Sequence, residues 1–331
     1  MQLHRAVVRR ATLAGIALVL AVVSCSSDAG VSSQTDRSGM RNGTSHAVAT
    51  ALPYTLSPAL RALEPESQHR VLQAKQQVAW LGALHNDALA EIAAGRTRIV
   101  AEQSKLLGDA HGNRSARRAV LWAESKAERC SMAAAIIVRY GRDVDARLGL
   151  AGRSVTAERA ILQQHGSRVS CNFTSPMLLL SRSSGVAPSS GINPDVTEAG
   201  LAAGEQMTIA AEATDGSVGA VTAATDAVLA SMTSAEAQDL EYAAGVAGVA
   251  VASSQYWTGY AAGGGSRPDT LPEPMMILRR WPLWAARLAL IDVSGCIATA
   301  GVAYSTGTRS AGQLLGACGW GALGASGLAM M

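Results

Sequence analysis

Residues 292–325 read DVSGCIATAGVAYSTGTRSAGQLLGACGWGALGA, and this stretch joins two apolar arms through Gly307. The first arm spans residues 281–304, and the second arm, residues 311–331, is almost free of polar side chains. Small residues recur four positions apart at Gly301/Ser305, Gly312/Gly316 and Gly321/Ala325. That spacing puts small side chains on one helical face, where two backbones can approach closely. We therefore expect residues 277–331 to form a Gly-rich apolar helical hairpin.

The hairpin also predicts a disulfide bond. Gly307 lies 11 residues after Cys296 and 11 residues before Cys318. If Gly307 marks the tip, both sulfurs stand at the same height on facing helices, and tight packing can bring the Cα atoms within the roughly 7 Å that a bridge needs. We predict a Cys296–Cys318 bridge, which leaves Cys130 to pair with Cys171. The alternative is that these cysteines act as small apolar residues without a bridge.

The sequence is compatible with two locations for the hairpin, a lipid bilayer or the interior of a soluble bundle. The basic pair Arg279-Arg280 and the uncharged second arm favour entry into a bilayer. Arg287 and Asp292 oppose it, because a charge at the bilayer centre costs about 2.5–3.5 kcal/mol. The other location is the interior of a soluble bundle.

Residues 57–166 and 196–262 read as helical regions, which makes the chain an all-α helical bundle. In the first region Val78, Leu81, Ala88 and Ile92 form an amphipathic stripe, and the helix is expected to end near Gly95. Further helices are expected over 98–107, over 114–148 and from Ser154.

In the second helical region, residues 233–236 have the form of a capping box that begins a helix, and this helix ends at the glycines from Gly263. Two breaks separate the regions. Residues 167–195 are predicted as a loop or linker and residues 263–276 as a Gly/Pro linker, because both are rich in residues that interrupt helices.

The N-terminus is typical of a lipoprotein signal peptide over residues 1–24. Three arginines precede a short apolar run that ends in Val22-Val23-Ser24-Cys25. This exit resembles the lipobox, which predicts acylation of Cys25, a palmitate-type membrane anchor and a place in the cell envelope. Ser26 follows, a pattern of lipoproteins sent to the outer membrane. Residues 25–56 are predicted as a flexible tether because they lack an apolar period. The alternative is an ordinary secretory signal.

Charge disfavours nucleic acid as a partner. Residues 1–24 carry three arginines and no acid, so the rest of the chain is formally neutral, given 28 basic and 25 acidic residues in all. A neutral chain has no general attraction to a polyanion.

No motif for a nucleophile, a phosphate loop, a metal or another cofactor stands out. His85 shares a helical face with apolar residues, and with Asn86 beside it we consider both an acid–base or ligand role and a core position. The core position is favoured. Tyr256 and Trp257 could stack on a sugar or peptide, but aromatic residues at helical spacing more often pack in a core.

Three short motifs appear in order along the chain: Gly82-x-x-His85-Asn86-x-x-Leu89, Ser253-Ser254-x-Tyr256-Trp257 and Asp292-Val293-x-Gly295. Together with the Gly-rich tail they resemble an uncharacterised family of small exported bacterial proteins. The resemblance implies the organisation described above and no activity.

The sequence thus predicts a structural or interaction lipoprotein, with residues 281–331 available for a protein partner or self-association. A second hypothesis is a membrane-active protein whose hairpin inserts or oligomerises. An envelope enzyme using His85 is disfavoured, because no partner carboxylate or nucleophile stands at a recognisable spacing.

Overall fold

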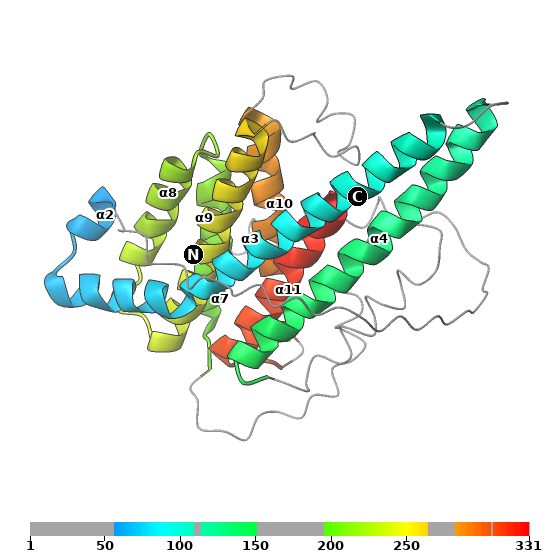
Figure 1. Cartoon of the computed structure of the whole chain (residues 1–331). Coiled ribbons are helices and arrows are strands. Elements are labelled where there is room, and N and C mark those ends of the chain that lie inside the picture. Colours follow the sequence, from blue (N-terminus) through cyan, green and yellow to red (C-terminus); the bar gives the residue numbers. More distant parts are fainter. Residues whose placement is uncertain (1–55, 109–113, 151–194, 264–281, 306, 331) are drawn as a thin grey trace, which may run out of the picture. The chain divides into compact units, whose positions relative to one another are not determined.

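The computed structural model describes residues 56–108, 114–150, 195–263, 282–305 and 307–330. Every regular element in these ranges is an α-helix, and the helices pack together as a bundle (Figure 1). The predicted all-α class is therefore confirmed. The signal segment, nearly all of the tether and most of both linkers lie outside the described residues.

Helix α9 (Ala237–Ala262) is the helix around which the others pack. It is rich in alanine, glycine and valine, and it is buried on nearly every side. Small side chains let neighbouring helices come close, because the distance between helix axes depends on the residues at the contact. The helices in contact with α9 are α3 (Pro65–Gly108), α7 (Glu198–Glu212), α8 (Val218–Ala230), α10 (Pro282–Ser305) and α11 (Ala311–Ala329).

Helix α3 runs unbroken from Pro65 to Gly108, so the predicted helix end near Gly95 is wrong. Gly95 is buried, and a Cβ atom there would lie 2.6 Å from Sδ of Met132 on α4 (Arg114–Arg147). The glycine thus makes room for a side chain of the neighbouring helix. The predicted stripe is correct, because its four apolar residues are all buried. Helix α4 matches its predicted range, whereas the helix expected from Ser154 falls outside the described residues.

The predicted capping box at residues 233–236 is also wrong. Helix α9 begins at Ala237, and Glu236 precedes it without a capping hydrogen bond from its side chain. The guanidinium group of Arg70 on α3 donates to the carbonyl oxygens of Thr233 and Ala235 at 2.7 and 2.9 Å. These bonds hold the segment as a turn between α8 and α9.

Side-chain capping occurs at other helix starts. The hydroxyl of Thr197 accepts hydrogen bonds from the backbone N–H groups that begin α7, and Ser217 does the same for α8. Ser57 caps the short helix α2 (Pro58–Arg61) in the same way. Thr197 also donates from its hydroxyl to Asp239 on α9 at 2.7 Å, so the start of α7 is fixed to the central helix.

Helices α10 and α11 form the expected antiparallel hairpin, and they lie side by side in Figure 1. Gly307 has φ +99°, a left-handed conformation that suits glycine, at the turn between them. Of the predicted small-residue pairs, Gly321/Ala325 lies at the contact between the two helices, whereas no atom of another element lies within 4 Å of a Cβ placed on Gly301. The close approach is at Gly295, where a Cβ would lie 2.5 Å from the carbonyl oxygen of Gly321 and 2.7 Å from Cβ of Ala325.

Two alanine substitutions on α10 test this contact. We expect Gly295→Ala to lower the free energy of unfolding by about 1–3 kcal/mol, because the added methyl group overpacks a backbone contact. Gly301→Ala is the matched control. It adds the same group to the same helix where there is space, and it should be neutral or stabilising by up to about 1 kcal/mol. Urea unfolding of both variants measures the difference, and equal effects would contradict the assigned contact surface.

Candidate functional site

His85 lies in the interior of the bundle. It occupies the buried face of α3, and its side chain is 2% exposed. Its Nε2 atom is 3.4 Å from Oδ2 of Asp292 on α10, whose side chain is fully buried. Its Nδ1 atom is 3.2 Å from Oδ1 of the neighbouring Asn86. The tertiary structure therefore places a carboxylate from a distant part of the chain beside the histidine, although Nε2 makes no hydrogen bond within the described residues.

The carboxylate of Asp292 on α10 contacts side chains of two other helices. Besides facing His85, its Oδ2 atom accepts a hydrogen bond of 2.9 Å from the indole N–H of Trp257 on α9. A buried carboxylate without such partners is costly, because water no longer solvates the charge. Its second oxygen, Oδ1, and the hydroxyl of the buried Ser253 have no hydrogen-bond partner in the described part of the chain. The cluster is thus only partly satisfied.

Aromatic rings close one side of the cluster. Tyr256 meets Trp257 edge to face, with 5.1 Å between ring centroids, and Tyr260 stacks on Tyr256 at 5.9 Å. The Tyr256 hydroxyl donates to the carbonyl oxygen of Leu89 at 2.9 Å. Burial, and then the proximity of Tyr260 and Asp292, raises the pKa of Tyr256 well above its usual range. The phenol therefore remains protonated and serves as a donor between α9 and α3.

The three motifs noted in the sequence come together here. His85 and Asn86 come from α3, Tyr256 and Trp257 from α9, and Asp292 from α10. Glycine and serine residues of the same motifs make the adjoining helix contacts. A Cβ on Gly82 would lie 2.7 Å from Cβ of Ala252, and the hydroxyl of Ser254 donates to the carbonyl oxygen of Gly216 at 2.7 Å.

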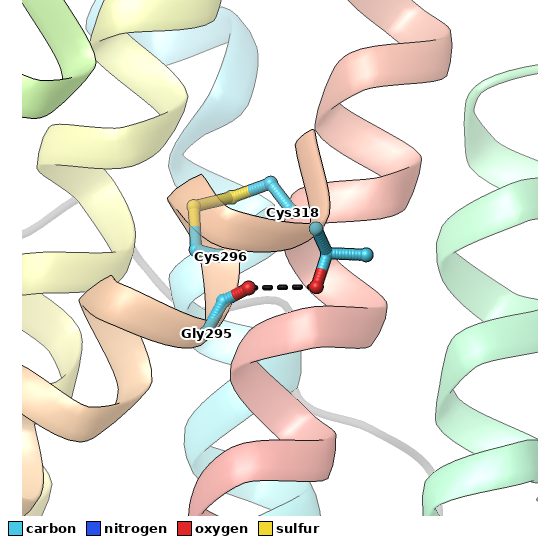
Figure 2. The surroundings of a disulfide bond; sticks show 4 residues. Gly295, Cys296 and Cys318 are labelled. Atoms are coloured by element: carbon cyan, nitrogen blue, oxygen red, sulfur yellow. Dashed lines mark hydrogen bonds between the residues drawn. A yellow bond between two sulfur atoms is a disulfide. The ribbon is translucent and has the colours of Figure 1, made fainter. Parts of the chain in front are cut away.

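Cys296 and Cys318 are joined by a disulfide bond within the hairpin (Figure 2). Their Cα atoms are 3.7 Å apart, closer than in most disulfides. Both side chains are fully buried. Beside the bridge, the carbonyl oxygen of Gly295 accepts a 2.7 Å hydrogen bond from the Thr299 hydroxyl (Figure 2).

Two other predicted cysteine sites are only partly visible. Cys130 on α4 is buried and disulfide-bonded, and its expected partner Cys171 lies outside the described residues. Cys25, the expected lipid attachment site, lies outside them as well. The pairing of Cys130 with Cys171 and the acylation of Cys25 therefore stay predictions.

The described residues form no evident reaction site. A small hollow near Gly216 and Val293, lined mainly by apolar side chains, has room for about one water molecule (about 20 Å³). In the described ranges, no group of three or more histidine, cysteine, aspartate or glutamate residues is placed to hold a metal ion. His85, Asp292 and Trp257 are each at most 2% exposed, so a substrate cannot reach them without helix displacement. Their arrangement can position helices against one another.

The same pairing of a buried carboxylate with a donor from another helix recurs elsewhere. Asp145 on α4 accepts a 3.0 Å hydrogen bond from the indole N–H of Trp320 on α11. Asp226 on α8 lies 2.5 Å from Nζ of Lys75 on α3. Sequence reasoning missed these roles, although an acid within an apolar helix is a usable signal, since burial requires a partner.

Comparison of the chain with protein-family models, with curated proteins and with solved structures found no match.

Removal of the shared carboxylate tests the role of the cluster. We expect Asp292→Ala to lower the free energy of unfolding by about 3–5 kcal/mol, because it leaves His85 and Trp257 buried without their partner. Asp143→Ala, at an exposed position of α4, is the control and should change it by less than about 0.5 kcal/mol. Chemical denaturation measures both values.

If Asp292→Ala does not fold, Trp257→Phe provides a milder change that removes the N–H donor, with an expected loss of about 1–3 kcal/mol. Unchanged stability in both variants would show that the cluster does not hold the helices together.

Proposed function

We propose that this protein is an exported lipoprotein, held to a membrane by an acyl chain on Cys25, whose helical body has a structural or interaction role. The proposal of a non-catalytic role is based on the burial of the cluster formed by His85, Asp292 and Trp257. None of these side chains is more than 2% exposed. An enzyme needs its reacting groups within reach of substrate. A sealed cluster in which Asp292 of α10 accepts a hydrogen bond from Trp257 of α9 and faces His85 of α3 instead fits a role in fixing the positions of these three helices.

The membrane attachment is supported by the N-terminal sequence. A basic segment, a short apolar run and the small residues before Cys25 provide the features that export and lipid transfer require. The apolar run is shorter than the roughly 20 residues that a permanent spanning helix needs. A cleaved signal followed by acylation is therefore a better account than an N-terminal membrane helix.

The second candidate is a membrane-active protein that inserts its hairpin. One helix among the described residues, over Ala285–Ser305, is long and apolar enough to cross a membrane, with a mean hydropathy of 1.5. Its partner in the hairpin argues against insertion, because α11 is packed against α3, α4 and α9. Leu314, Leu315 and Trp320 on α11 are at most 3% exposed, and insertion would have to remove them from these contacts.

Substitution of Cys25 separates the two candidates. In cells supplied with labelled palmitate, we expect the unchanged chain to carry label and to stay with the membrane fraction during an alkaline carbonate wash. Cys25→Ser should carry no label and should be released by that wash, because acylation is its proposed anchor. Ser26→Ala is the matched control and should keep both properties.

Retention of unlabelled Cys25→Ser in washed membranes would favour the inserted hairpin. Absence of label on the unchanged chain would refute the lipoprotein assignment.

A further inference from the structure

Charge is strongly segregated along this chain. Residues 195–263, which form α7, α8 and α9, carry nine acidic residues and no lysine, arginine or histidine. Residues 98–108 of α3 and 114–126 of α4, which we call the α3–α4 tip, carry six basic and two acidic residues. Because the part of the chain after residue 24 is formally neutral, this separation is not visible in the net charge.

The acidic side of this separation is exposed on α7. Glu198, Glu205 and Glu212 recur every seven residues, which places them on one helical face, and all three are exposed. Helix α7 packs on α8, α9 and α10, whereas α4 packs on α3 and α11. The acidic face and the α3–α4 tip therefore belong to different parts of the bundle surface.

The α3–α4 tip also exposes large apolar side chains. Leu106, Val120 and Trp122 are 55%, 57% and 47% exposed. Arg98, Lys105 and Lys126 are exposed on the same two segments. Tryptophan and aliphatic side chains beside lysine and arginine are the composition that favours the interface of an anionic bilayer, where rings sit at headgroup level and cations meet lipid phosphates.

We propose that the α3–α4 tip binds the surface of an anionic lipid bilayer. This inference rests on the proposed function, because the acyl anchor supplies the bilayer. Residue 56 follows Cys25 by 31 positions, and 31 residues span at most about 110 Å in any conformation, so the body stays near the membrane. The anionic surface attracts the α3–α4 tip and repels the acidic face of α7, and the two effects favour one orientation of the bundle.

The positive charge of the α3–α4 tip is complementary to the negative charge of an anionic lipid surface. The attraction is local, since exposed charges farther apart than about 8 Å are screened at physiological salt. Each lysine or arginine near an anionic surface adds about a fivefold gain in binding, and several are grouped here. The exposed Trp122 adds an interfacial contact that depends on apolar area and not on salt.

Vesicle sedimentation of the non-acylated Cys25→Ser chain tests the proposal. We expect binding to vesicles of about 30% phosphatidylglycerol in phosphatidylcholine, little binding to pure phosphatidylcholine, and strong weakening in about 1 M salt, where the screening length is about 3 Å. Adding Lys105→Glu and Lys126→Glu should weaken binding at least about tenfold. Adding Arg61→Glu and Arg309→Glu changes the net charge equally at exposed positions outside the tip, and should alter binding less than about twofold.

Three results would overturn the proposal: no binding to anionic vesicles, equal binding to neutral vesicles, or equal weakening by the two double variants. Analytical ultracentrifugation supplies a fourth. Self-association that only the Lys105→Glu, Lys126→Glu pair abolishes would assign the surface to a second copy of the chain. The vesicle test does not depend on acylation. Failure of palmitate labelling would refute the proposed lipid anchor, whereas the measured binding of the α3–α4 tip to anionic vesicles would still hold.

Discussion

The backbone contact between α10 and α11 is the constraint on which the rest of the structure depends. At Gly295 and Gly321 there is no room for a side chain, and the Cys296–Cys318 bridge lies directly beside this contact. The contact fixes which face of α10 is turned toward α11. Asp292, almost one turn earlier, is consequently turned toward α3 and α9, where it meets His85 and Trp257.

Buried carboxylates complement this close packing. Aromatic residues make up only 4% of the chain, so it has few large rings with which to fix helices by shape alone. A buried acid has strict requirements, because leaving it unpaired costs several kcal/mol. Each such acid therefore fixes one helix against a donor on another element, as the pairs Asp292 with Trp257, Asp145 with Trp320, Asp239 with Thr197 and Asp226 with Lys75 illustrate.

The distribution of charge relates this core to the surroundings of the molecule. Two of the nine acids in residues 195–263, Asp226 and Asp239, are buried in such pairs, whereas the glutamates of α7 face solvent. The basic residues are concentrated instead on α3 and α4. A neutral total charge can therefore hide local fields that orient a protein near a charged surface.

Local pattern in the sequence was sufficient for the all-α class, for the range of α4 and for the hairpin around Gly307, because helix periodicity and a turn glycine act over short distances. It failed at Gly95, where Met132 of another helix fills the space, and at residues 233–236, where Arg70 binds the backbone carbonyls. It also identified His85 and Trp257 without their shared partner. Only the tertiary structure placed Asp292 between them, because a carboxylate buried on α10 finds its donors according to helix packing and not according to sequence spacing.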